Sequence, residues 1–151
     1  MATDEHTLVC RVVGRYCALP LAHVAETLRP LPVEPLAGIQ RPVLGAAIIR
    51  GTPVPVIDVA WLLTGEQSRP TRFVMVKAGD RRVALAVDAV VGVRSIPPHA
   101  LHELSPLFRD TSTDAITALG TLDNQLLIVL AGTRLVPDHV WNALEHIGAP
   151  R

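Results

Sequence analysis

Aromatic residues are scarce in this chain of 151 residues, where Phe, Trp and Tyr together make up 3%. Any hydrophobic core must therefore be built from Val, Leu, Ile and Ala. An excess of charge of either sign is also lacking, because 14 basic residues balance 14 acidic ones. No general electrostatic attraction to nucleic acid or to an anionic membrane is expected. Partners should instead be recognised by shape and apolar contact.

Cysteine is nearly absent, with only Cys10 and Cys17 in the chain. These two flank a predicted turn and can form at most one bridge, and a reducing compartment is the simpler interpretation because small secreted domains usually carry more cysteines. The first seven residues include two acids and contain no apolar h-region, so an ordinary secretory signal is not expected. No run approaches the roughly 18 uncharged apolar residues that suggest a transmembrane segment. These absences predict a cytoplasmic protein that does not insert into a membrane.

Catalytic motifs are missing as well. The sequence has no Gly-x-Ser-x-Gly elbow, no P-loop and no dinucleotide fingerprint. His99, His102 and Glu103 are spaced as metal ligands can be, but no second cluster adds the three or four converging groups that a zinc site needs. We therefore expect no enzyme, no cofactor and no metal.

Short strand-like segments separated by turns dominate the sequence. Hydrophobic residues make up 49% of the chain, and 13 prolines and 10 glycines are scattered through it. The predicted strands cover residues 8–13, 16–21, 24–28, 43–50, 52–59, 72–77, 82–87, 90–96, 116–122 and 125–130. Short helical pieces are predicted at 60–63 and around 100–107, and an amphipathic helix is predicted from Pro137 to Gly148.

This pattern predicts an all-β fold made of barrels. A parallel α/β sheet is disfavoured because no sufficiently long crossover helices separate the strands. The length suits a single domain, which we place over residues 5–148, with a break near residues 65–70, where turn-forming residues are most concentrated.

The most informative stretch runs over residues 43–59, where Arg50 and Asp58 are the only charged residues in an apolar run. Its glycines and prolines predict two adjoining strands around a tight bend. Arg50 must either extend to water, pair internally with Asp58 or another acid, or present its guanidinium to a partner. A single exposed cation in such a run indicates a recognition surface more readily than an active site.

Several blocks of residues, in this order, resemble the CheW-like coupling proteins of bacterial chemotaxis. They are Tyr16-Cys-Ala-Leu-Pro-Leu with Val24 and Glu26, Gly45 with Arg50-Gly51, Val54-Pro-Val-Ile-Asp58, Arg72-Phe-Val-Met-Val, Val87-Asp88-x-Val90, and Gly92-Val93. Each block is weak alone, but together they span most of the chain from Leu8 to Leu130. Their ordered spacing makes the resemblance fairly specific.

The resemblance implies two SH3-like, five-stranded β-barrel lobes packed together, with short helices and a C-terminal helix, and a first strand able to cross between the lobes. It also implies a non-enzymatic cytoplasmic scaffold, recruited to receptor arrays. The implied partners are the cytoplasmic tip of methyl-accepting chemoreceptors and the regulatory domain of a CheA-type histidine kinase. The kinase-facing surface should be an apolar end of one barrel, and its residues remain unassigned.

The resemblance also implies which residues face the receptor. These are Val24, Glu26, Gly45, Ile48, Arg50 and Gly51. Some of them have structural interpretations that are equally open: Val24 can be ordinary core packing, and Gly45 can be a backbone position that tolerates no side chain. Asp88, which ends a predicted strand, is typical of an Asp that caps the following turn.

One departure from the family pattern concerns Ile48. The family usually has Asn-x-Arg-Gly at this place, and Ile48 removes the side-chain amide with its donors and acceptor. The family also often has Leu-Asp near the place of Leu130-Ala131, and here that acid is missing. The alternative function is therefore a divergent CheW-like protein that binds only receptors, or another regulator, and does not couple to the kinase.

Overall fold

The computed structural model describes residues 5–97, 100–103, 116–131 and 135–148. The fold consists mainly of β-strands. In chain order the elements are β1 (Glu5–Val12), β2 (Arg15–Pro20), the 3-10 helix η1 (Leu21–His23), β3 (Val24–Leu28), β4 (Val43–Ile49), β5 (Thr52–Asp58), α1 (Val59–Thr64), β6 (Arg72–Ala78), β7 (Arg81–Val87), β8 (Ala89–Ile96), β9 (Leu101–Glu103), β10 (Ile116–Leu122), β11 (Gln125–Leu130) and α2 (Asp138–Gly148).

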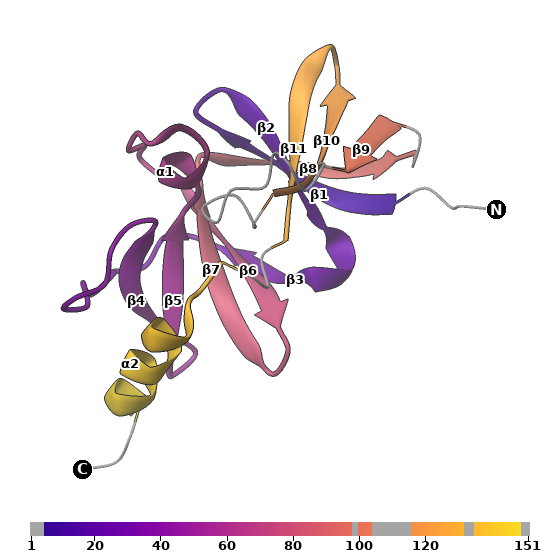
Figure 1. The fold of residues 1–151 in the computed structure, drawn as a ribbon. Helices are drawn as coiled ribbons and strands as arrows, with labels where there is room; N and C mark the ends of the chain where they lie inside the picture. Colours follow the sequence, from indigo (N-terminus) through magenta and orange to yellow (C-terminus); the bar gives the residue numbers. More distant parts are fainter. Residues whose placement is uncertain (1–4, 98–99, 104–115, 132–134, 149–151) are drawn as a thin grey trace.

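The strands form two sheets, and these make the two lobes visible in Figure 1. One sheet has six strands in the order β8-β1-β2-β11-β10-β9, and the other has five in the order β3-β6-β7-β5-β4. The chain enters the five-stranded sheet after β2 and leaves it after β7, so the first hairpin shares a sheet with the last strands. Residues 65–70 connect α1 with β6 inside the five-stranded lobe. The predicted two-lobe, all-β class is confirmed.

Hairpins join β1 to β2, β4 to β5, β6 to β7 and β10 to β11, as predicted, but two of these turns lie one residue away from their expected places. Val13 and Gly14 form the β1–β2 turn with φ of 50° and 72°, and Arg50 and Gly51 form the β4–β5 turn with φ of 52° and 79°. Two-residue turns with positive φ at both positions match the right-handed twist of the flanking strands. Val13 and Arg50 therefore belong to turns, where the sequence had placed them at strand ends.

The predicted short helix around residues 100–107 is wrong over the part that the structure describes. Leu101–Glu103 is instead strand β9, paired antiparallel with β10, and residues 104–107 lie outside the described residues. Gly120 on β10 explains the close approach, because a Cβ there would lie 2.8 Å from the carbonyl oxygen of Ala100. This extra edge strand brings the first sheet to six strands.

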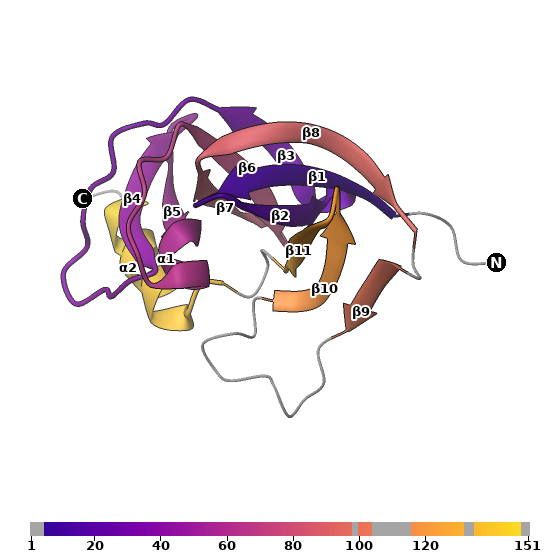
Figure 2. The same ribbon diagram turned by 90° about the horizontal axis from the view of Figure 1, so that it is seen from above.

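The main hydrophobic core lies between the sheets and draws side chains from both. Leu8 and Leu19 come from one sheet, and Val74 and Leu85 from the other. Figure 2 shows β1 and β2 lying across β6 and β7 in this region. Two smaller cores fill the lobes themselves. The two lobes thus share a core that consists mainly of aliphatic side chains, as the scarcity of aromatic residues had predicted.

Cys10 and Cys17 face one another across the β1–β2 hairpin as free, buried thiols. Burial raises the pKa of Cys10 to about 12. Burial, and next the neighbouring Cys10, hold the pKa of Cys17 well above its usual range. Both cysteines therefore act as small apolar core residues, since only a thiolate is a good nucleophile.

Helix α2 packs beside β4 and β5, although it follows strand β11 of the other lobe (Figure 1). Val140 and Leu144 are buried in the main core, as the predicted apolar face requires. Arg81 holds the outer side of the helix: its guanidinium lies 4.8 Å from the ring centre of Trp141 and 3.6 Å from a carboxylate oxygen of Glu145. The C-terminal helix thus forms one wall of the five-stranded lobe.

Helix α1 begins at an Asp cap. The Oδ1 atom of Asp58 accepts a hydrogen bond of 3.2 Å from the backbone N–H of Trp61. Its Oδ2 atom lies 3.3 Å from Arg41, whose guanidinium lies 5.2 Å from the Trp61 ring centre. Asp58 is nearly fully buried and thus depends on these two partners.

Replacing Asp58 by Ala is therefore expected to lower the free energy of unfolding by about 1–2 kcal/mol, the usual effect of losing an N-cap. Asp58→Asn keeps an acceptor for the Trp61 N–H and should lose roughly half as much. Urea denaturation followed by circular dichroism measures both. Equal stability of Asp58→Ala and wild type would show that the cap and the Arg41 contact contribute nothing.

Candidate functional site

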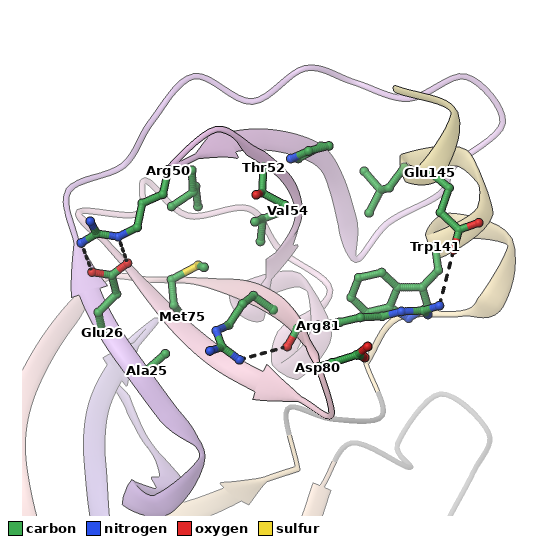
Figure 3. Close-up of a pocket in the computed structure, with 14 residues that line it drawn as sticks. Ala25, Glu26, Arg50, Thr52, Val54, Met75, Asp80, Arg81, Trp141 and Glu145 are labelled. Carbon is green, nitrogen blue, oxygen red and sulfur yellow. Dashed lines mark hydrogen bonds and ion pairs between the residues drawn. The ribbon is translucent and has the colours of Figure 1, made fainter. Parts of the chain in front are cut away.

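Arg50 stands at the tip of the β4–β5 hairpin, where the left-handed turn with Gly51 projects its side chain away from the strands. The side chain of Arg50 is 77% exposed. It nevertheless makes a two-point ion pair with Glu26 on β3: Nε donates to Oε1 over 2.9 Å, and Nη2 donates to Oε2 over 2.6 Å (Figure 3). Parallel paired hydrogen bonds of this kind fix the geometry of both side chains.

This ion pair joins the two ends of the five-stranded sheet. Strand β3 lies at one edge of the sheet and β4 at the other, so the strands that carry Glu26 and the Arg50 turn are separated by three others. A flat sheet would hold these residues far apart, because neighbouring strands are spaced by about 4.8 Å. The sheet must therefore curl strongly, as a barrel does. Within the described residues its edge strands are bridged here by side chains, and no backbone ladder joins them.

The ion pair also changes the titration of Glu26. The hydrogen bonds from Arg50 are the main cause that lowers the pKa of Glu26 below its ordinary value of 4.5, and partial desolvation opposes them. The same hydrogen bonds raise the pKa of Arg50. A carboxyl with a lowered pKa in the folded state stabilises it above the unfolded pKa, and this contribution is lost as pH falls through the folded pKa. The pair is therefore intact at neutral and mildly acidic pH.

In an NMR titration, the Glu26 carboxyl should have its midpoint below 4.5, the ordinary value. Arg50→Ala should raise that midpoint, because the hydrogen bonds that favour the carboxylate are gone. Arg72→Ala is the matched control, since Arg72 is an exposed arginine that, within the described part of the chain, donates only to the carbonyl of Thr71. An unchanged midpoint in Arg50→Ala would show that the pair does not form in solution.

Of the partners considered for Arg50, Asp58 is not the one found. Asp58 caps α1 and pairs with Arg41, whereas Arg50 pairs with Glu26. Of the three alternatives left open for Arg50, the structure shows pairing with an acid other than Asp58, on strand β3, while the side chain stays largely exposed. Arg50 and Glu26, both predicted from the family resemblance, are brought into direct contact.

Gly45 occupies a position with no room for a side chain. Its φ is 146°, and a Cβ there would lie 2.0 Å from the carbonyl oxygen of Glu34. The same segment is held by backbone hydrogen bonds in both directions between Glu34 and Ala46. The packing interpretation of Gly45 is thus sufficient to explain the glycine.

The other predicted site residues differ in their exposure. Val24 is half-buried and packs against the core between the sheets. Ile48 is 57% exposed, which is unusual for a large apolar side chain, and pairs across the hairpin with Pro53. Gly51 is exposed and supplies the second left-handed residue of the turn. Ile48 and Gly51 therefore flank Arg50 on the surface, whereas Val24 contributes mainly to packing.

Asp88 caps a turn, but a different turn from the one expected. Its Oδ2 atom accepts a 2.7 Å hydrogen bond from the backbone N–H of Val13, in the β1–β2 turn. Its own N–H donates to the carbonyl of Arg11 over 3.0 Å, and its carbonyl accepts from the hydroxyl of Thr71. Asp88 thus joins the two lobes at the point where the chain leaves the five-stranded sheet.

A groove of about 610 Å³ extends from the Glu26–Arg50 pair to helix α2 (Figure 3). It lies on the five-stranded lobe, between the ends of its strands and the helix. Its lining residues are Ala25, Glu26, Ile49, Arg50, Thr52, Pro53, Val54, Met75, Asp80, Arg81, Arg82, Trp141, Leu144 and Glu145. The groove has the size typical of binding pockets, roughly 300–1,000 Å³.

Sequence reasoning missed the half of this groove that α2 and the β6–β7 hairpin form. The amphipathic pattern of the helix predicted its buried face, but it did not indicate which strand the helix would cover. The pair Arg81-Arg82, directly after the Gly79 turn, was the available signal. Adjacent strand residues point to opposite faces, so one of these two arginines had to lie on the face that is otherwise apolar. Trp141 is half-buried and contributes to both the core and the groove.

A metal site is not formed by the residues that the structure describes, in which no group of three or more His, Cys, Asp or Glu side chains converges. His99, which the spacing argument had included, lies outside the described residues. None of the described helices is long and apolar enough to cross a membrane.

Comparisons with known proteins agree with the resemblance noted in the sequence. The chain matches the CheW-like domain family over residues 6–139. It is 30% identical over 99 residues to Protein PilI of Pseudomonas aeruginosa, a match that covers 64% of this chain and 56% of that protein. The chain thus spans little more than half the length of this relative.

A solved structure confirms the fold. The scaffolding protein TtCheW from Thermoanaerobacter tengcongensis superimposes with a TM-score of 0.74, covering 87% of this chain and 92% of that one at 20% identity. The two sheets and the lobes that they form define a β-rich, two-lobe domain. The chain belongs to the CheW-like domain family.

Proposed function

We propose that this protein is a non-enzymatic adaptor that couples the cytoplasmic tip of chemoreceptors to the regulatory domain of a CheA-type histidine kinase. Membership of the CheW-like family supports the proposal. The observation that carries it is the Glu26–Arg50 pair: a rigid, exposed, two-point ion pair at the mouth of an apolar groove. Such a pair gives orientation and specificity to a docking surface whose affinity comes from apolar contact.

The proposed receptor-facing residues are Glu26, Ile48, Arg50 and Gly51. They surround the β4–β5 turn and leave the groove open beside them. Val24 and Gly45, predicted with them, support this surface from within, Val24 by packing and Gly45 by allowing the Glu34 backbone to approach. The mechanism is geometric, because a body with two lobes and a continuous core can hold two partners in a fixed relation.

Cytoplasmic residence and recruitment to receptor arrays belong to the same proposal. The two free thiols and the balanced charge support it, since disulfides are rare in reducing compartments and no membrane attraction is expected from net charge. The kinase-facing residues remain unassigned.

The exposed Ile48 favours a second candidate function. An apolar side chain stands where the family pattern has an amide, and it is the most exposed of the large apolar side chains in the described part of the chain. A surface changed in this way suits an adaptor that binds only the receptor, or another regulator, without the kinase.

Separate binding titrations distinguish these candidates. The purified chain is titrated by calorimetry with the receptor tip fragment encoded by the same organism, and in a second experiment with the kinase regulatory domain. The coupling proposal predicts saturable binding of each. Binding of the receptor alone supports the second candidate in its receptor-binding form. Binding of neither contradicts the coupling proposal and that form, and leaves another regulator as the partner.

A further inference from the structure

The groove beside the Glu26–Arg50 pair has an apolar floor. Ile49, Val54 and Met75 lie at the end of the lobe interior, and Leu144 and Trp141 face them from helix α2. These side chains come from strands and a helix that the core holds in place, so the groove is preformed. A floor of this kind fits the apolar face of a helix, which anchors through residues spaced by three and four.

The arginine side chains around the groove differ in whether they have an acidic partner. Arg50 is engaged by Glu26 at two points, and Arg81 is engaged by Glu145 and the Trp141 ring. Arg82 makes only a long hydrogen bond of 3.5 Å to the carbonyl oxygen of Arg81. No acidic group lies within 4.0 Å of Arg82 among the residues that the structure describes.

A second cation reinforces this local excess. Lys77 lies directly opposite Arg82 in the β6–β7 ladder, so both side chains leave the same face of the hairpin. Like charges in directly opposed positions destabilise a strand pair. Of the acidic residues that line the groove, Glu26 and Glu145 are paired with Arg50 and Arg81, and Asp80 is at the hairpin turn near Trp141 (Figure 3). A carboxylate placed at Arg82 would therefore relieve a repulsion that the folded chain leaves uncompensated.

We propose that this groove receives a helical segment of the receptor tip that carries apolar anchors and one carboxylate, and that Arg82 binds the carboxylate. The inference rests on the proposed function, because the groove is continuous with the Glu26–Arg50 surface. Helix α2 is then part of the binding site, and Arg82 sets which receptors fit. The commitment to the receptor follows from this continuity, and the excess positive charge at Arg82 specifies the carboxylate that the receptor segment must carry.

The test measures the affinity of the receptor tip fragment for wild type, Arg82→Glu and the control Arg72→Glu. Both variants reverse an exposed arginine of the same hairpin. Among the described residues each arginine donates only to a neighbouring backbone carbonyl, but Arg72 does not line the groove. Arg82→Glu should weaken binding at least tenfold, and Arg72→Glu less than twofold. Where Arg82→Glu fails to fold, Arg82→Gln replaces it, with an expected loss of three- to fivefold.

Charge exchange identifies the carboxylate. Each acidic residue of the receptor fragment is replaced in turn by Lys, and one of these fragments should bind Arg82→Glu more tightly than the native fragment does. Equal effects of Arg82→Glu and Arg72→Glu would overturn the inference while leaving the proposed function intact. Loss of kinase binding, with receptor binding unchanged, would also overturn it. Failure of wild type to bind the receptor would overturn both.

Discussion

Replacing Arg50 by Glu is expected to weaken capture of the receptor tip at least tenfold while leaving the fold in place. The side chain is 77% exposed and its ion pair lies at the surface. Exposed pairs contribute little to stability, so the melting temperature should change by less than about 3 °C. At the proposed docking surface, in contrast, a second carboxylate would replace the paired guanidinium, and a reversed charge is far more unfavourable inside an interface than on a free surface.

A charge exchange separates recognition from structure. The double variant Glu26→Arg with Arg50→Glu restores the ion pair with its direction reversed. If the pair serves only to hold the two ends of the sheet together, the double variant should bind the receptor as wild type does. If Arg50 faces the partner, the double variant should fold normally and still bind poorly. Calorimetric titration with the receptor fragment, together with thermal unfolding, decides between these results.

Replacing Gly45 by Ala is expected to cause the largest loss of stability among the predicted site residues. The new Cβ would lie 2.0 Å from a backbone oxygen of Glu34, which cannot rotate away as a flexible side chain could. The residue would also hold a φ of 146°, which L-residues rarely adopt. The two effects together should lower the free energy of unfolding by about 2–4 kcal/mol, which urea denaturation measures directly.

Gly79→Ala is the matched control for this substitution. Gly79 also has a positive φ, of 67°, but nothing lies within 4 Å of the Cβ position. Its replacement should cost only the conformational strain, about 1 kcal/mol. If Gly45→Ala and Gly79→Ala are equally stable, the close approach of the Glu34 segment is absent in solution. A loss of receptor capture in Gly45→Ala would then indicate a direct contact.

The fold was largely predictable because its signals are local. Alternating apolar residues indicated the strands, and the Gly and Asn residues of two-residue turns indicated the hairpins. Strand β9 was not predictable: Leu101–Glu103 is short, and its pairing depends on the close backbone approach that Gly120, some way along the chain in β10, allows. The curl of the five-stranded sheet agrees with the barrels that the strand pattern predicted, whereas the number of strands in each lobe was implied by the family resemblance alone.

The site was predictable only in part, because some of its contacts join residues that are far apart in the sequence. Arg50 stood out as a cation in an apolar run, and a tight bend was predicted beside it, although the turn that presents Arg50 begins one residue earlier than expected. Its partner Glu26 is 24 residues away and on the opposite edge strand, so pairing required the curled sheet. The position of α2 and the isolation of Arg82 depend on tertiary packing, which neighbouring residues in the sequence do not specify.

The central claim, that this chain couples a receptor to a kinase, is tested most directly by a three-component assembly experiment. The immobilised receptor tip is incubated with the kinase regulatory domain, with and without this protein, and the retained kinase is measured. Coupling predicts that the kinase is retained only when the protein is present, and that Arg50→Glu abolishes this retention. Retention of the protein without the kinase, or of neither, would contradict the claim.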